Sequence, residues 1–134
     1  MGEMMVEPNS LAHLYLNMAG DDWLNISAAD SEAREFFEPD PDERKSLVLD
    51  SVRSLAQAGY IKIGVLQRPD PEKPIIDFFE WPGTVDDRLE HLSQVYTPEQ
   101  DSNAWGWSCV LEITDEGRQV EALLPELDER FRDW

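Results

Sequence analysis

The spacing of apolar residues predicts five helices along the chain. The first covers 10–19, where apolar side chains fall at i, i+3, i+4 and i+7 and therefore share one face. The second opens at Ser27, with Asp30 three residues further on in the pattern of a capping box. Two prolines within 38–42 must end this helix, because proline cannot continue one.

The third predicted helix, 41–58, is the most regular. Val48, Val52 and Leu55 recur at helical spacing, and Gly59 follows as a C-terminal stop. This helix therefore presents a continuous apolar face, and we expect it to line the core.

Two later helices are each predicted to begin after a threonine that can cap them. Thr84 precedes a helix whose apolar positions are Val85, Leu89, Leu92 and Tyr96. Thr114 precedes the closing helix, which Pro125 is expected to kink. The apolar stripe of the closing helix is Val120, Leu123, Leu124, Leu127 and Phe131.

Alternation of apolar and polar residues predicts strands at 60–66 and 107–113. The inward face of the first is Ile61, Ile63 and Val65, and that of the second is Trp107, Cys109, Leu111 and Ile113. A further extended segment is expected at 75–81, and 23–26 fits either a small strand or an irregular turn. Four positions on these apolar faces are predicted to be core: Leu55, Ile61, Leu111 and Leu123.

Three helices, a strand, a long excursion, a returning strand and a closing helix resemble the element order of a winged helix. The segment Leu55–Ile61 resembles a third helix turning into the first wing strand. Leu111–Arg118 resembles the second wing strand running into the Leu-Thr-x-x-Gly-Arg pattern of regulators of the multiple-antibiotic-resistance repressor type. The resemblance covers 23–66 and 107–124.

This resemblance implies an α+β, winged-helix-like fold, mostly helical, with a small antiparallel sheet. We expect a single domain over 1–134, with 67–106 forming a wing insertion that carries its own helix. In the family, the third helix and the wing read DNA, so the resemblance also implies a helix-turn-helix-like transcription regulator.

Charge argues against nucleic acid as the partner. The chain of 134 residues has 29 Asp and Glu against 11 Lys and Arg, a formal net charge of −18. Affinity for DNA, RNA or anionic lipid depends on positive charge. No apolar run approaches the roughly 20 residues of a membrane span, one cysteine excludes an internal disulfide, and no secretion signal opens the chain. We expect a cytoplasmic protein.

The few basic residues are nevertheless concentrated. Residues 44–73 have a net charge of +3, whereas the rest of the chain has −21. The DNA-binding alternative would use five of these residues: Arg44, Lys45, Arg53, Lys62 and Arg68. Local pairing of these bases with surface acids is the competing interpretation.

The sequence carries no pattern of an active site. No serine has a nucleophile-elbow context, and no glycine-rich phosphate loop occurs. Asp87, Glu90 and His91 could ligate a metal on one helix face, but without a companion histidine pattern they fit a solvated helix face better. Cys109 is expected to be a small buried hydrophobe. We therefore expect neither enzymatic activity nor a cofactor. A metal- or carboxylate-dependent enzyme is the third alternative, after a protein-binding domain and a DNA-binding regulator.

The wing insertion is the candidate for the functional surface, because a hairpin needs only about 2–5 loop residues. The predicted partner-binding residues are Phe78, Phe79, Trp81, Asp86, Asp87, Glu90, Tyr96 and Trp105. The aromatics either form the core of the insertion or are exposed as anchors for a partner. Trp134 either docks on the body or acts as a hydrophobic hook in a dimer.

We therefore expect an acidic, non-enzymatic protein-binding domain, a monomer or a homodimer. An immunity, antitoxin-type or regulatory protein that captures a basic partner would have these properties. The alternative is a winged-helix DNA-binding regulator.

Overall fold

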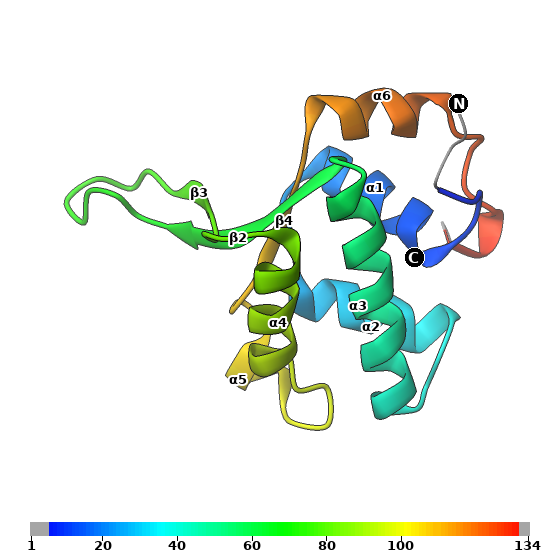
Figure 1. The fold of residues 1–134 in the computed structure, drawn as a ribbon, viewed down its shortest axis with the longest axis horizontal. Coiled ribbons are helices and arrows are strands. Elements are labelled where there is room, and N and C mark those ends of the chain that lie inside the picture. Colours follow the sequence, from blue (N-terminus) through cyan, green and yellow to red (C-terminus); the bar gives the residue numbers. More distant parts are fainter. Residues whose placement is uncertain (1–5, 132–134) are drawn as a thin grey trace.

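The computed structural model describes residues 6–131, so Trp134 lies outside the described residues. This part of the chain is α+β, with a small antiparallel sheet among helices (Figure 1). The elements are α1 (Leu11–Asp21), β1 (Leu24–Asn25), α2 (Ile26–Phe36), α3 (Pro41–Gln57), β2 (Ile61–Gln67), β3 (Asp77–Glu80), α4 (Val85–Val95), α5 (Ser102–Trp105), β4 (Val110–Ile113), α6 (Asp115–Leu123) and a 3₁₀ turn (Glu129–Phe131).

The sheet has the strand order β1-β4-β2-β3, and every pairing is antiparallel. Leu111 of β4 is the central residue, because it lies opposite Leu24 of β1 on one side and Ile63 of β2 on the other. The ambiguous segment at 23–26 thus contributes a two-residue strand that closes one edge of the sheet. At the other edge lies β3.

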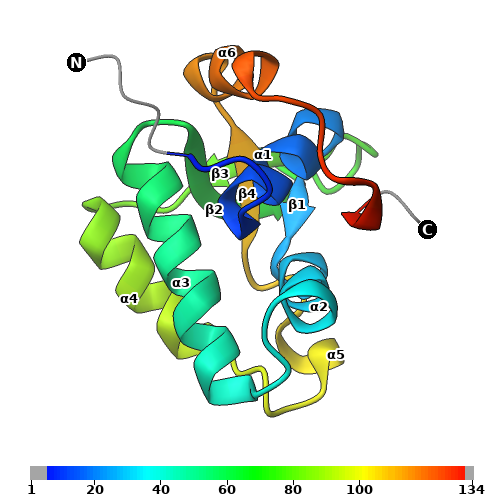
Figure 2. The ribbon, with the colours of Figure 1, turned by 90° about the vertical axis from the view of Figure 1, so that its right-hand side faces the viewer.

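The helices pack around the sheet in pairs. α3 contacts α1, α2 and α4, and α6 lies on α1. Figure 2 shows α3 and α4 side by side. The predicted core positions Leu55, Ile61 and Leu111 are all buried, as is Cys109, and these predictions are confirmed.

Side-chain caps set where the helices begin. Thr84 and Asp87 form a complete capping box at the start of α4, as each side chain accepts from the other's backbone N–H. The prediction for α2 is wrong in detail: its cap is Asn25, whose Oδ1 accepts from Ala28 N at 2.9 Å. Helix α2 therefore begins one residue before Ser27, and Asp30 lies in the core instead of completing a cap.

Two predicted core side chains lie in solvent instead. Leu123 is 75% exposed, because α6 ends there and the chain turns extended at Leu124, just before Pro125. Pro125 thus terminates the helix and does not kink it, so the helical stripe does not continue. Trp107 is 64% exposed, because β4 starts only at Val110 and Trp107 lies in the preceding turn.

The hairpin of β2 and β3 extends as an arm from the body of the molecule (Figure 1). The arm is defined here as residues 64–80. Three prolines, Pro69, Pro71 and Pro74, lie in the connection between its strands. At its base, a Cβ on Gly64 would stand 2.1 Å from the carbonyl oxygen of Phe79, so the two strands can approach this closely only at glycine.

Within the described residues, no helix combines the length and the apolar character that crossing a bilayer requires.

Candidate functional site

The insertion between β2 and β4 contributes β3, α4 and α5, and α4 covers one side of α3. Two cations of α3 contact α4. Lys45 Nζ donates to the carbonyl oxygen of Ser93 at 2.7 Å, and Arg53 Nη1 lies 2.6 Å from Asp86 Oδ1. These two cationic side chains of α3 are therefore directed at the insertion.

Arg44, the first of the predicted nucleic-acid contacts, lies in the core and is only 4% exposed. Its Nε donates to Asp30 Oδ1 at 2.7 Å and its Nη1 to the carbonyl oxygen of Pro39 at 2.6 Å. Burial lowers the pKa of Arg44, but the hydrogen bond and charge of Asp30 outweigh it, so the pKa is raised overall. Arg44 cannot contact a phosphate from this position, and its assignment to a nucleic-acid surface is wrong.

The same carboxylate ties the insertion to the body. The hydroxyl of Tyr96, which follows α4, donates to Asp30 Oδ1. The pKa of Tyr96 is raised above its ordinary value, mainly by burial and secondly by the hydrogen bond to Asp30, so the phenol stays protonated. Asp30 thus accepts from α3 and from the insertion at once, and it joins three segments of the chain.

The remaining predicted nucleic-acid residues do not converge on one surface. Lys62 is exposed on β2, opposite Glu112 of β4. Arg68 is exposed on the arm. With Arg44 buried and with Lys45 and Arg53 in contact with α4, no continuous cationic stripe remains on α3.

Three of the predicted aromatic anchors are core residues. Trp81 is 8% exposed, Trp105 is 3% and Tyr96 is 0%. The Trp81 ring stacks on His91 with 3.8 Å between centroids, and Tyr96 meets Trp105 at 5.0 Å. They join the main core of the protein. Their burial was predicted, but they belong to the main core and do not form a separate core of the insertion, and their use as exposed anchors is excluded by burial.

The exposed apolar side chains of the insertion lie on the arm. Phe79 is 39% exposed, Ile75 is 60% and Ile76 is 49%, whereas Phe78 is half-buried. From the sequence, Ile75 and Ile76 were expected in an extended segment but not in the site. Their position directly after Pro74 was the available signal, because a proline-bounded edge segment has fewer neighbours to cover its side chains.

Acidic side chains are exposed on α4, the helix that follows the arm in the chain. Asp86, Asp87 and Glu90 are all exposed on α4. Hydrogen bonds from the backbone and side chain of Thr84 hold the pKa of Asp87 below its usual value, so it stays ionised. Residues 77–101 contain seven Asp and Glu against one arginine.

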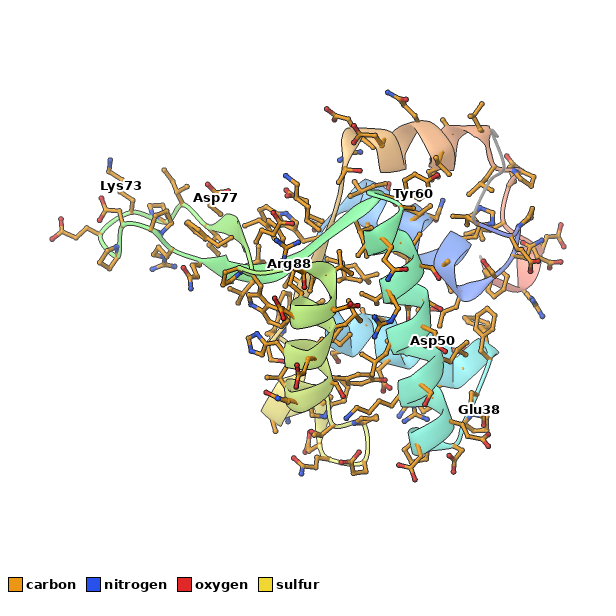
Figure 3. All side chains as sticks on the ribbon, viewed as in Figure 1. Glu38, Asp50, Tyr60, Lys73, Asp77 and Arg88 are labelled. Carbon is orange, nitrogen blue, oxygen red and sulfur yellow. The ribbon has the colours of Figure 1, made fainter. Side chains whose placement is uncertain are left out.

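That one arginine, Arg88, is already engaged. Its Nη1 lies 3.1 Å from Glu80 Oε2 of β3, and its Nε donates to the carbonyl oxygen of Trp81 at 2.6 Å. In Figure 3, Arg88 lies where the arm meets α4, while Asp77 and Lys73 lie farther out along the arm. Arg88 therefore fixes the arm to the body. Among the acids of α4, Asp86 is paired with Arg53 of α3, whereas Asp87 and Glu90 have no ion pair within the described residues.

The metal-ligating interpretation of α4 has no geometric support. Asp87 caps the helix and His91 stacks on Trp81. Within residues 6–131, no three His, Cys, Asp or Glu side chains are placed to hold a metal ion. Burial raises the pKa of the Cys109 thiol well above its usual value, so Cys109 remains an unreactive thiol.

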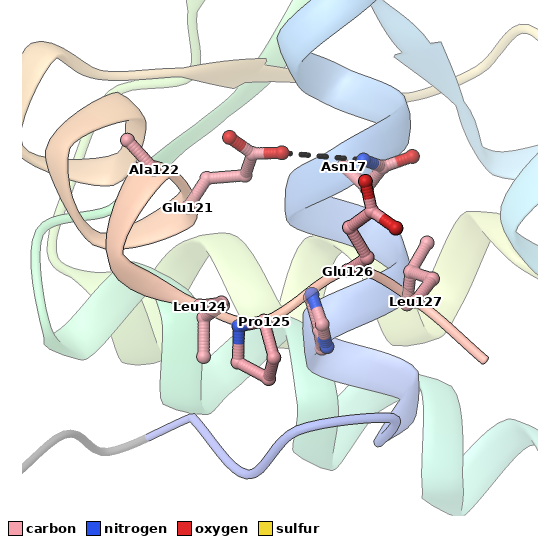
Figure 4. Close-up of a pocket in the computed structure, with 8 residues that line it drawn as sticks. Asn17, Glu121, Ala122, Leu124, Pro125, Glu126 and Leu127 are labelled. Atoms are coloured by element: carbon pink, nitrogen blue, oxygen red, sulfur yellow. Dashed lines mark hydrogen bonds between the residues drawn. The ribbon is translucent and has the colours of Figure 1, made fainter.

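A separate open hollow of about 450 Å³ lies between α1 and the segment after α6 (Figure 4). One side-chain hydrogen bond at the hollow joins α1 to α6, and a second is local to the start of α1. Asn17 Nδ2 donates to Glu121 Oε1 at 3.2 Å, and the backbone N–H of Asn9 donates to Nδ1 of the buried His13 at 2.9 Å. The hollow is a packing joint, and the arm with the acidic face of α4 is the candidate functional site.

Comparison with family models, with curated proteins and with solved structures finds no match to this chain.

Proposed function

We propose that this protein is a winged-helix-like, non-enzymatic domain that binds a basic protein through its wing insertion. Three points support the winged-helix part. The element order from α1 to β2 follows the order that the resemblance implies, β2 and β4 pair as wing strands would, and the extra elements fall between those strands.

The observation that carries the proposal is the packing of α4 on α3. A DNA-reading domain of this type would present α3 to the duplex. Here Lys45 and Arg53 contact α4, and Asp86 brings a negative charge to the same surface. Binding DNA through α3 would require α4 to leave, which would break both contacts and expose Leu89 and Leu92. The DNA-binding alternative is correspondingly disfavoured.

The surface left available suits a cationic protein. The arm supplies exposed apolar side chains, and α4, which follows the arm in the chain, supplies exposed acids. Apolar contacts provide affinity once they are desolvated, and a net charge of −18 steers a basic partner into contact. A cationic toxin held by an immunity or antitoxin protein, or the basic face of another factor held by a regulator, would meet these requirements.

Site-specific crosslinking in cells tests this proposal. A photoreactive residue replaces Ile76 on the arm, and a matched variant carries it at Leu123, which is also exposed but lies on α6. We expect the Ile76 variant alone to capture a basic protein. Purified, that protein should bind the wild type, and more weakly as salt is raised above about 150 mM.

Three results would contradict the proposal. They are capture from Leu123 alone, a captured protein that is acidic, and sequence-dependent submicromolar binding of duplex DNA at about 150 mM salt in a mobility-shift titration. The last result would favour the DNA-binding regulator.

A further inference from the structure

We propose that β3 is a strand-addition site, at which an extended cationic segment of the partner pairs with the free edge of the sheet. This inference rests on the proposed function and specifies how the basic partner is bound. It is carried by the backbone of β3, by its exposure and by the acids around it.

The backbone of β3 has one free side. β3 is the last strand in the order β1-β4-β2-β3, and its pairing with β2 uses one edge only. Trp81 N donates to the carbonyl oxygen of Ile63 at 2.9 Å, which fixes the alternation of this antiparallel ladder. Asp77 and Phe79 therefore direct their backbone groups at β2, and Phe78 and Glu80 direct theirs at the open edge.

The open edge is protected by the shortness of β3 and by its charged ends, but not by proline, lysine or a covering element. Natural edges are blunted by proline, lysine or a covering element, and between Pro74 and Trp81 the chain has neither proline nor lysine. The six residues 75–80, about 20 Å of extended chain, are exposed except for the half-buried Phe78. Pro74 marks the outer limit of the site, because proline cannot donate to a ladder.

Charge identifies the occupant. Asp77 and Glu80 lie at the two ends of β3, and α4 opens with Asp86 and Asp87 a few residues further along the chain. Among the described residues no cation pairs with Asp77, whereas Glu80 is paired with Arg88 and Asp86 with Arg53. Lysine or arginine on an added strand would therefore lie beside Asp77 and would compete with Arg88 for Glu80. A second copy of the chain is the wrong occupant, because it would bring another net charge of −18 and the same acids to the edge.

The side chains of β3 add an apolar contact between the charges. Phe78 lies over Gly64, where its Cζ would be 2.8 Å from an added Cβ, so this ring is already used within the arm. Phe79 lies on the opposite face of the strand and is 39% exposed, with Ile75 and Ile76 preceding it. Asp77 shares the face of Phe79, whereas Glu80 lies on the face of Phe78. The matching partner segment therefore has an apolar residue opposite Phe79 and basic residues opposite Asp77 and Glu80, three positions apart.

Asp77 also occupies one edge donor in the free protein. Its Oδ1 accepts from the backbone N–H of Phe78 at 2.9 Å. A carbonyl of the added strand would take over this N–H, and a basic side chain of the same strand would take over the Asp77 carboxylate. Strand addition therefore replaces the hydrogen bond between Phe78 N–H and Asp77 Oδ1 with two interactions, one made by the Phe78 N–H and one made by the Asp77 carboxylate.

Amide hydrogen exchange on the full chain, measured by NMR, tests this arrangement. The probe is a peptide of about ten residues with lysine at every third position and valine elsewhere, and its control carries glutamate in place of lysine. At saturation with the lysine peptide, exchange at Phe78 and Glu80 should slow at least about tenfold. Exchange at Asp77 and Phe79, whose N–H groups already bond to β2, should change less, and the glutamate peptide should have no effect.

Two variants at one position separate backbone pairing from side-chain contact. Ile76→Pro removes an edge donor without touching the pairing of β2 with β3, and Ile76→Ser keeps the donor but loses the side chain. Strand addition predicts weaker binding of the lysine peptide by Ile76→Pro than by Ile76→Ser, and unchanged binding by Leu123→Ser. Equal binding by the two Ile76 variants would contradict it.

The outcomes also distinguish this inference from the proposed function. Binding of the lysine peptide that slows amides of α4 but not those of Phe78 and Glu80 overturns strand addition and leaves the proposed function standing. Absence of binding, together with no basic protein crosslinked from Ile76, overturns both.

Discussion

Arg44 Nε lies 2.7 Å from Asp30 Oδ1 in the core, where the two side chains neutralise each other between α3 and α2. Because Tyr96 donates to the same carboxylate, this pair also anchors the insertion. Arg44, which the DNA-binding alternative assigned to a nucleic-acid surface, therefore helps to hold in place the insertion that covers one side of α3.

Replacing Arg44 with methionine should lower the free energy of unfolding by about 3–5 kcal/mol, because it leaves the Asp30 carboxylate buried and unpaired. Urea denaturation measures this loss. The double variant Arg44→Met with Asp30→Asn removes the unpaired charge and keeps an acceptor for Tyr96, so it should be more stable than Arg44→Met alone. A double variant that is no more stable would show that the charge pairing is not the cause.

Gly64→Ala should destabilise the protein by about 1–3 kcal/mol, because its Cβ would collide with the backbone of Phe79. The loss should be accompanied by faster amide exchange at Phe79. Gly20→Ala is the matched control. It lies in α1 with nothing within 4 Å of the new Cβ, so it should stabilise the protein by up to about 1 kcal/mol. Equal effects of the two substitutions would contradict the close approach at Gly64.

Leu111→Ala should cost about 2–5 kcal/mol, because Leu111 is fully buried between β1 and β2. Leu123→Ala should stay within about 0.5 kcal/mol of the wild type, since the side chain is in solvent. The same chemical change at two positions therefore tests the register of the sheet and the end of α6, with denaturation midpoints as the measurement.

Stability should fall as His13 becomes protonated. Burial lowers the pKa of His13 below 6.5, against a smaller opposing effect of Glu121, and Nδ1 must stay unprotonated to accept from Asn9 N. The pKa of His13 is lower in the folded state than in the unfolded state. The stabilisation that neutral His13 provides is therefore complete above the unfolded-state pKa and is lost as the pH falls below that pKa.

A comparison of His13→Asn with the wild type isolates this effect from the titration of the many carboxylates. Asparagine offers an acceptor oxygen near the position of Nδ1 and does not titrate. Between about pH 7.5 and pH 5.5, the wild type should lose more stability, or gain less, than His13→Asn. Parallel pH profiles for the two proteins would refute this role of His13.

Local patterns predicted most of the helices and two strands, because capping, prolines and apolar periodicity act over a few residues. The order of the elements likewise led to the expectation of a small antiparallel sheet. One error arose where a distant partner decides the outcome, and another where a proline ends a helix that it was expected to kink. Asp30 has the spacing of a capping residue, but its role depends on Arg44, fourteen residues away. Leu123 fits a helical stripe that ends because the chain turns extended at Leu124.

The candidate site was only partly predictable for the same reason. The insertion and its acids could be selected from the sequence, but the buried Trp81 could not be separated from the exposed Ile76, because burial depends on how α4 packs against α3. Likewise, the concentration of basic residues at 44–73 was real in the sequence. In the structure, Arg44 of α3 points into the core, and Lys45 and Arg53 of α3 contact α4.

The open edge of β3 is also a potential route to aggregation, since an unpaired strand can template another copy of itself. At neutral pH, mutual repulsion between chains of net charge −18 keeps the edges apart. This repulsion vanishes as the pH approaches the isoelectric point near 4.2. There the colloidal stability of the protein should collapse through edge-to-edge pairing of the arm, so storage well above that pH, or capping of the edge by the partner, should keep the protein in solution.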